Sequence, residues 1–134
     1  MRLSIDHRTQ YHFSQPQARV VQLLRMTPID CAGQTVIDWR IDVDCDARLR
    51  EGRDGYGNIT TMLYIDGPID AVAIMVRGDV LTDDMDGRVK GTLEPLPPLF
   101  YTRTTPLTLA DAAVSALSGP GETSFEHAMA LNAA

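Results

Sequence analysis

Thiols and imidazoles are scarce in this sequence, which has two cysteines and three histidines among its 134 residues. A thiol nucleophile needs a histidine nearby and is best activated at a helix N-terminus. Cys31 lies in a polar stretch with no helical pattern after it, and Cys45 lies on the apolar side of an alternating stretch. We therefore interpret Cys31 as an incidental loop thiol and Cys45 as a small buried residue. Neither a disulfide between them nor any catalytic residue is expected.

The sequence lacks the residue spacings that usually mark metal and cofactor sites. The sequence has no Cys-x-x-Cys and no His-x-x-x-His pair, which disfavours zinc. Asp42-x-Asp44-x-Asp46 resembles the start of an EF-hand loop, but Ala47 stands where that loop needs glycine and Arg53 where it needs glutamate. We interpret this acidic run as a solvated strand face, and the sequence predicts neither a metal nor a cofactor.

An excess of positive charge and a long apolar run are also absent. Twelve Lys and Arg stand against 18 Asp and Glu, which gives a net charge of −6. Such a chain repels phosphate backbones, so nucleic acid is not expected as a partner. No apolar run approaches the roughly 20 residues of a membrane-spanning helix, and the charged start has no signal-peptide core. We predict no membrane association and a cytoplasmic location.

The pattern that is present is that of β-strands. A chain of 134 residues is most simply one domain with a real apolar core. Short alternating stretches follow one another with turn residues between them, which is typical of an antiparallel sandwich. We predict a mainly β fold, an antiparallel β-sandwich of six to eight strands with one or two short C-terminal helices. The predicted strands are 3–13, 20–26, 36–45, 47–51, 59–66, 69–81 and 89–93.

The predicted sheet is organised around the segment Arg53-Asp54-Gly55-Tyr56-Gly57-Asn58. Its glycines and its asparagine take positive φ at little or no steric cost, so the segment predicts a hairpin reversal. It does not fit a nucleotide-binding loop, since a third glycine is missing and a strand pattern follows where a helix is needed. Asp66-Gly67-Pro68 predicts a second turn.

Two alternating stretches supply candidate core residues. In 3–13 the odd positions form one apolar face that includes His7, which we interpret as a hydrogen-bonded core histidine. In 36–45 the apolar side makes the single tryptophan a core anchor; its members are Ile37, Trp39, Ile41, Val43 and Cys45.

The pattern changes at Glu94. Three prolines in 94–101 exclude a central strand and predict an extended crossing segment. Thr108 resembles a helix N-cap, and the following apolar spacing predicts a short helix ending at Leu117. A second helix is expected from Thr123 or Ser124. We predict a sandwich domain over 1–106 and a helical segment over 107–134 that leads into a catalytic core outside this chain.

Five motifs follow one another between residues 2 and 118. They are His7-x-Thr9-x-Tyr11-x-Phe13-x-x-Pro16, Gln22-x-Leu24-Arg25-x-Thr27-Pro28, Trp39, Asp54-x-x-Gly57-Asn58 and Tyr101-x-Arg103-x-Thr105-x-Leu107-Thr108. This series resembles the N-terminal region of bacterial transglutaminase-like proteins, within the transglutaminase-like cysteine peptidase superfamily. The resemblance implies a β-sandwich placed before a core that supplies the catalytic Cys, His and Asp, and no residue here matches those positions. It implies structural signature residues at His7, Tyr11, Pro28, Trp39, Asp54, Gly57 and Asn58.

Three functions remain open at this point. The first is a non-catalytic domain that positions the transglutaminase-like core or helps it bind a protein substrate through a sheet face or edge. The second is a stand-alone β-sandwich module that binds a protein or forms a homo-oligomer through an exposed strand edge. The third is an enzyme in its own right, which needs Cys31 or Cys45 near a histidine.

Overall fold

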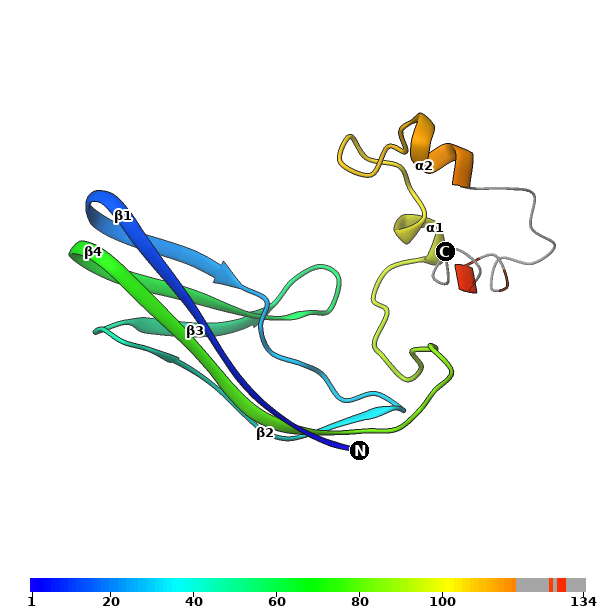
Figure 1. Ribbon diagram of the computed structural model, residues 1–134, viewed down its shortest axis with the longest axis horizontal. Coiled ribbons are helices and arrows are strands. Elements are labelled where there is room, and N and C mark those ends of the chain that lie inside the picture. Colours follow the sequence, from blue (N-terminus) through cyan, green and yellow to red (C-terminus); the bar gives the residue numbers. More distant parts are fainter. Residues whose placement is uncertain (118–125, 127, 130–134) are drawn as a thin grey trace. The chain divides into compact units, whose positions relative to one another are not determined.

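The computed structural model describes residues 1–117, 126, 128 and 129. The chain forms two compact units, Met1–Pro97 and Pro98–Ala134, and each is described by itself. The first unit contains four strands, namely β1 (Arg2–Leu24), β2 (Gln34–Val43), β3 (Arg48–Arg53) and β4 (Ile59–Thr82) (Figure 1). The second contains the short helices α1 (Pro98–Tyr101) and α2 (Ala112–Leu117).

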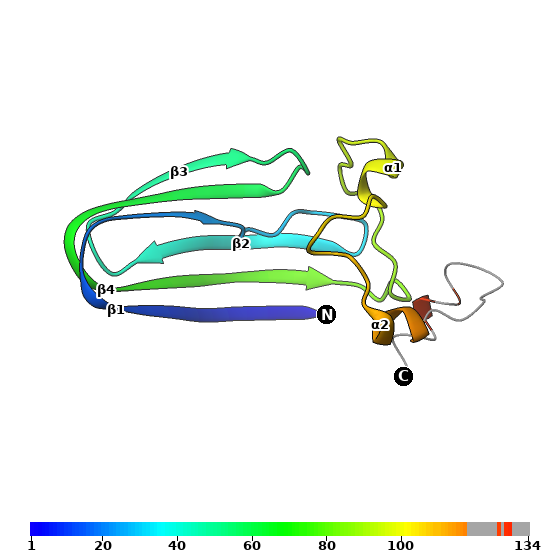
Figure 2. The ribbon, with the colours of Figure 1, turned by 90° about the horizontal axis from the view of Figure 1, so that it is seen from above.

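β4 is the central strand of a single antiparallel sheet. Its second part pairs with the first part of β1 on one side and with β2 on the other. Its first part pairs with the end of β1 and with β3. We call the three segments 2–12, 71–82 and 34–43 the β2 half of the sheet, and the segments 19–24, 59–66 and 48–53 the β3 half. Both long strands bend between the halves, so the sheet folds over (Figures 1 and 2).

The core lies between these halves and draws side chains from both. Leu63 and Val72 have no exposed surface, and Ile74 is 1% exposed. The alternation predicted for 59–66 and 69–81 is confirmed, because one face of β4 is buried through both parts of the strand. Each such side chain contributes about 1.5–3 kcal/mol by leaving water. The buried cluster consists of Val20, Leu24, Leu63, Ile65, Ile69, Val72 and Ile74.

The strand count differs from the prediction. The mainly β, antiparallel character is confirmed, but the described residues form four strands rather than six to eight. The predicted strands 3–13 and 20–26 are one strand, because β1 is an edge strand and can keep Pro16 in an unpaired stretch without losing a ladder bond. The predicted strands 59–66 and 69–81 are likewise one strand, and 89–93 is not a strand.

The bend replaces the turn that was predicted at Asp66-Gly67-Pro68. The pairing of β1 with β4 shifts register on both sides of Gln17, which lies opposite Ile69. A Cβ at Gly67 would overlap the carbonyl oxygen of Gln17. Glycine therefore allows β1 to pass close to β4 where the sheet folds over.

β2 departs from simple alternation near its start. Val36 pairs with Val80 and Asp38 with Asp79, so Ile37 is the extra residue of a β-bulge. Ile37 is 49% exposed, which corrects its prediction as a core residue. After the bulge the alternation holds, and Trp39, Ile41 and Val43 are half-buried.

The second unit starts its longer helix later than predicted. The backbone N–H of Val114 donates to Asp111 Oδ1 at 2.8 Å, so Asp111 rather than Thr108 is the N-cap of α2. The hydroxyl of Thr108 instead accepts from the backbone N–H of Thr105 in a tight turn. Pro98 begins α1, where an extended segment was predicted, because proline suits the first turn of a helix. Thr123 and Ser124, the predicted start of the second helix, lie outside the described residues.

No helix among the described residues is long and apolar enough to cross a membrane.

Candidate functional site

The segment Arg25–Pro28, which leaves the end of β1, is held by the hairpin loop between β3 and β4. Asp54 Oδ2 accepts from Arg25 Nε at 2.8 Å and from Asn58 Nδ2 at 3.0 Å. Its other oxygen, Oδ1, accepts from the backbone N–H groups of Tyr56 at 2.9 Å and of Asn58 at 3.0 Å. One carboxylate thus fixes both the loop and its contact with the end of β1. We call Arg25, Asp54 and Asn58 the Asp54 cluster.

These contacts set the protonation state of Asp54. The Arg25 guanidinium, followed by the Asn58 amide, holds the pKa of the carboxyl far below its ordinary value of 3.8. Both oxygens already accept two hydrogen bonds each. A group that stays ionised near neutral pH and has its lone pairs occupied is poorly suited to general acid–base work.

The loop confirms the reversal that was predicted at 53–58. Arg53 pairs with Ile59, and Gly57 between them has a φ of +85°. The N–H of Gly57 donates to the carbonyl of Asp54 at 3.0 Å, and Arg53 Nη1 donates to the carbonyl of Gly57 at 2.8 Å. A Cβ at Gly57 would lie 3.3 Å from the carbonyl oxygen of Leu93. Glycine is therefore needed here for both conformation and close approach.

Trp39 holds the same segment from the other half of the sheet. Its indole Nε1 donates to the carbonyl of Met26 at 2.9 Å. Trp39 pairs with Gly78 of β4, and a Cβ at Gly78 would overlap an indole carbon and the carbonyl of Asp38. The missing side chain at Gly78 lets the indole lie across β4 and reach Met26.

An open hollow of about 550 Å³ lies beside this segment. Its lining includes one positively charged side chain, Arg53, and one negatively charged side chain, Asp30. Asp30 Oδ1 accepts from the backbone N–H of Val36 at 2.7 Å, so this carboxylate is committed to the fold. The remaining lining residues are Pro28, Ile29, Val36, Ile59, Gly91 and Leu93.

Five of the seven predicted signature residues meet around Arg25–Pro28. Trp39 bonds to Met26, Asp54 bonds to Arg25, and Asn58 bonds to the Asp54 carboxylate. Gly57 gives the loop its positive φ, and Pro28 belongs to the segment itself. His7 and Tyr11 lie elsewhere, on the first part of β1 opposite Val76 and Val72. That the seven residues form a family signature remains a prediction.

His7 is not a core histidine. It lies on the predicted face of β1, but it is exposed, because the first part of this edge strand lies outside the buried cluster, to which β1 contributes Val20 and Leu24. Its Nε2 is 3.0 Å from Thr9 Oγ1, so the predicted hydrogen bond exists within the same strand. Tyr11, on the same face, is 39% exposed.

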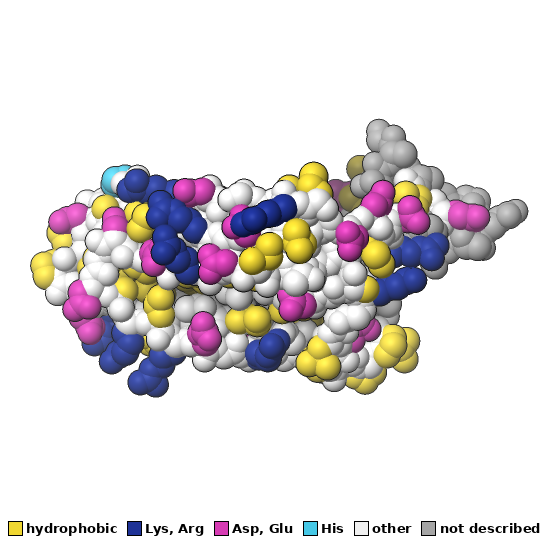
Figure 3. Space-filling view, turned by 90° about the horizontal axis from the view of Figure 1, so that it is seen from below, with side chains coloured by type: hydrophobic (Ala, Val, Ile, Leu, Met, Phe, Trp, Pro, Cys, Tyr) yellow, Lys and Arg dark blue, Asp and Glu magenta, His cyan; other side chains and the backbone are white. Residues whose placement is uncertain are grey.

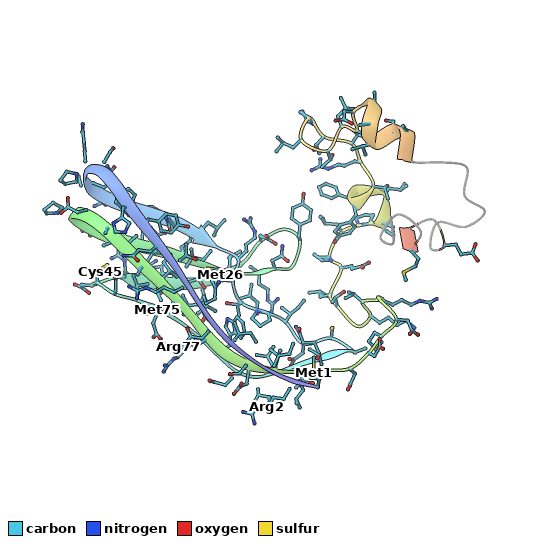
Figure 4. All side chains as sticks on the ribbon, viewed as in Figure 1. Met1, Arg2, Met26, Cys45, Met75 and Arg77 are labelled. Atoms are coloured by element: carbon cyan, nitrogen blue, oxygen red, sulfur yellow. The ribbon has the colours of Figure 1, made fainter. Side chains whose placement is uncertain are left out.

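Cys45 is not buried either. It follows the end of β2 and is exposed, towards the end of the sheet where β1 and β4 bend (Figure 4). Local burial of the sulfur and the carboxylates of Asp44 and Asp46 raise the pKa of its thiol. Cys31 is half-buried, and both thiols are free. A raised pKa is the opposite of what activates a thiol nucleophile.

The acidic run is divided among separate contacts. Asp44 Oδ1 accepts from the backbone N–H of Ala73 at 2.8 Å, and Asp42 forms an ion pair with Arg40 at 3.2 Å. Among the residues that the structure describes, no three His, Cys, Asp or Glu side chains form a group that could hold a metal ion.

Arg25 and Gly78 have structural roles that the sequence did not reveal. Arg25 lies 29 positions before Asp54, and no local pattern indicates that pairing. A lone glycine inside a strand pattern indicates a close approach of another backbone or ring, and this was the available signal at Gly78.

Residues 3–81 match the family described as the bacterial transglutaminase-like N-terminal region. The matched stretch is more than half of the chain. This chain belongs to that family. Searches among curated proteins and among solved structures found no match.

The family match coincides with the folded-over sheet. It begins at the second residue of β1 and ends one residue before the end of β4. The transglutaminase-like N-terminal region is thus built of β1 to β4 and their connections, and it includes the Asp54 cluster. The motif from Tyr101 to Thr108 lies outside the match.

Replacement of Asp54 by asparagine is expected to lower the melting temperature by several degrees, because the amide loses the ion pair with Arg25 and faces backbone N–H donors. The folded-state pKa lies below the unfolded value of about 3.8. The carboxylate therefore stabilises the fold above about pH 4, and this contribution is lost as the pH falls through the folded-state pKa.

Thermal melts between pH 7 and pH 2 check this prediction. The melting temperature of Asp54→Asn should fall less steeply with decreasing pH below about pH 4 than that of the parent chain. Asp66→Asn is the matched control, since Asp66 pairs with Arg19 in a largely exposed ion pair. Equal effects of the two substitutions would contradict the role given to the Asp54 cluster.

Proposed function

We propose that this chain serves as a non-catalytic domain of a longer transglutaminase-like protein, with the folded-over sheet as a two-layer β-sandwich. It positions the catalytic core or holds a protein substrate beside it. The observation that carries the proposal is the match of 3–81 to a family described as an N-terminal region, since this region coincides with the complete strand unit. A fold alone does not assign function, so the site residues must agree.

The polar groups support a binding role rather than bond-making. Asp54 is saturated with hydrogen bonds. The pKa of Cys45 is raised, and Nε2 of His7 is in contact with Thr9. A saturated carboxylate and a thiol of raised pKa lack the activated state that acid–base or nucleophilic catalysis requires. Binding through a sheet face then remains as the mechanism.

The Cys45 thiol is expected to react slowly with iodoacetamide at pH 7, at a rate below that of free cysteine. Its raised pKa keeps the thiolate fraction small. The measurement is the alkylation rate of a Cys31→Ser variant, followed by mass spectrometry, with a Cys45→Ser variant to report on Cys31. A rate well above that of free cysteine would indicate an activated thiol and favour an enzyme.

The intact mass of the gene product in its source cells tests the proposal directly. This chain has a mass of 14.7 kDa. The proposal predicts a much heavier product that contains a transglutaminase-like core after these residues. A product of 14.7 kDa would overturn it and would favour a free-standing interaction module.

A further inference from the structure

The outer face of the β3 half combines apolar and basic side chains in two rows that cross all three strands. Val21 of β1 pairs with Tyr64 of β4, which pairs with Arg48 of β3. The next row is built in the same way and consists of Leu23, Met62 and Arg50. Because side chains alternate across a strand, both rows lie on the face opposite the core residues Leu63 and Ile65.

The apolar part of this face is open to solvent. Val21 is 48% exposed and Leu23 is 46% exposed, although both lie in the paired stretch 19–24 near the end of β1. Tyr64 and Met62 beside them are half-buried. The side chains of Val21 and Leu23 point away from the core and contribute little to its packing. Their exposure together therefore indicates a surface that another molecule covers.

Arginines surround this apolar centre. The Arg48 guanidinium lies 5.3 Å from the centroid of the Tyr64 ring, and Arg50 is exposed in the next row. At one end Arg19 pairs with Asp66 at 2.7 Å, and just beyond the other end Arg25 pairs with Asp54 at 2.8 Å. Arg19 and Arg25 are thus neutralised by carboxylates, and the positive charge beside the exposed valine and leucine comes from Arg48 and Arg50, in a chain of net charge −6.

The outer face of the β2 half is different. There three of the four outward arginines form ion pairs with neighbouring carboxylates, namely Arg2–Asp79, Arg77–Asp6 and Arg40–Asp42. On the β3 half, by contrast, no ion pair among the described residues involves Arg48 or Arg50. Figure 3 shows a face on which basic and acidic side chains lie next to one another. The positive patch around apolar side chains is therefore particular to the β3 half.

We propose that the outer face of the β3 half binds a protein surface rich in Asp and Glu with apolar side chains at its centre. This inference rests on the proposed function and specifies the face and its partner. Carboxylates of the partner pair with Arg48 and Arg50, while its apolar groups cover Val21 and Leu23. Arginine, tyrosine and methionine are enriched at protein interfaces. An arginine that pairs with a carboxylate of the partner also fixes the orientation of that partner, because the pair is directional. A phosphate backbone would leave the apolar side chains of Val21 and Leu23 uncovered, which favours a protein as the occupant.

Binding of a fluorescent random copolymer of glutamate and tyrosine tests the proposal, with the full chain and anisotropy as the readout. The chain should bind the copolymer at low salt and release it as salt rises. The double variant Arg48→Glu/Arg50→Glu should weaken binding by about tenfold or more, because it puts carboxylates against carboxylates. Arg8→Glu/Arg40→Glu, on the outer face of the β2 half, makes the same change in net charge and should weaken binding far less.

A second variant keeps the test independent of the charge reversal. Val21→Thr/Leu23→Thr removes the apolar centre without touching an arginine, and it should also weaken binding while the thermal melt stays close to that of the parent chain. No binding by the parent chain, or equal losses for both charge variants, would overturn the inference. So would tighter binding to phosphatidylglycerol vesicles or to single-stranded DNA than to the copolymer.

The copolymer experiment tests this surface, and the intact mass of the gene product tests the proposed function, so each can fail without the other. A heavy gene product together with absent copolymer binding would overturn this surface alone. A gene product of 14.7 kDa together with copolymer binding would leave the surface standing and overturn the link to a core.

Discussion

Replacement of Leu63 by alanine is expected to lower the free energy of unfolding by about 2–5 kcal/mol. Leu63 has no exposed surface and lies in the buried cluster that joins the two halves of the sheet. Its neighbours in that cluster belong to paired strands, which limits how far they can move into the vacated space. The loss of apolar burial and the remaining cavity therefore add.

Urea denaturation followed by circular dichroism measures this loss. Leu23→Ala is the matched control, because Leu23 lies on the adjacent strand, faces outward and is 46% exposed. We expect it to change stability by less than about 1 kcal/mol. Similar losses in the two variants would contradict the assignment of Leu63 to the core and of Leu23 to the outer face.

Replacement of Gly78 by alanine is expected to cost about 3 kcal/mol, at the upper end for overpacking. The added methyl group would overlap the carbonyl oxygen of Asp38 and the indole of Trp39, and it would lie 3.0 Å from the Trp39 Cα. Backbone atoms cannot rotate away as a side chain can, so β2 must separate from β4. The hydrogen bond from Trp39 to Met26 should be lost with it.

Tryptophan fluorescence reports on this substitution directly, since Trp39 is the single tryptophan. Gly78→Ala should shift the emission to longer wavelength as the indole becomes more exposed. Gly55→Ala is the matched control, because a Cβ there meets nothing within 4 Å. It should leave the emission unchanged and stabilise the chain slightly, by about 0.4–1 kcal/mol. An unshifted spectrum in Gly78→Ala would contradict the packing of Trp39 over Gly78.

The sequence allowed the central part of the fold to be predicted wherever one face of a strand is buried. The alternation through Leu63 and through Ile74 was read correctly, and so was the reversal at Gly57, because local turn chemistry and side-chain period specify both. Antiparallel pairing followed from short spacing between strands without helices.

The continuity of the strands could not be predicted from the same pattern. Residues that normally end a strand, such as Pro16 and Gly67, are accommodated here by an unpaired edge stretch and by a close approach of two backbones. Both features depend on which strand lies beside them, and the local sequence pattern does not show which strands become neighbours in the fold. His7 and Cys45 were misplaced for a similar reason, since the alternating pattern does not show which positions of an edge strand are covered, nor where a strand ends.

The candidate site could be predicted in part. Asp54, Gly57 and Asn58 stood out because they share one short loop with recognisable turn chemistry. The partner of that loop, Arg25, lies 29 positions earlier, just after the end of β1, and no local pattern connects the two. The arginine-bordered outer face of the β3 half was invisible in the sequence, because it arises when β1 and β3 pair with the same part of β4.

Hydrogen–deuterium exchange shows whether the strand unit contacts a core. The amides of Met1–Pro97 are compared in the isolated chain and in the longer gene product. If this unit positions a transglutaminase-like core, exchange from its strands should be slower in the longer product, and the docking inference places that protection on the β3 half. Identical exchange in the two proteins would contradict a positioning role, since a domain that positions a core must contact it.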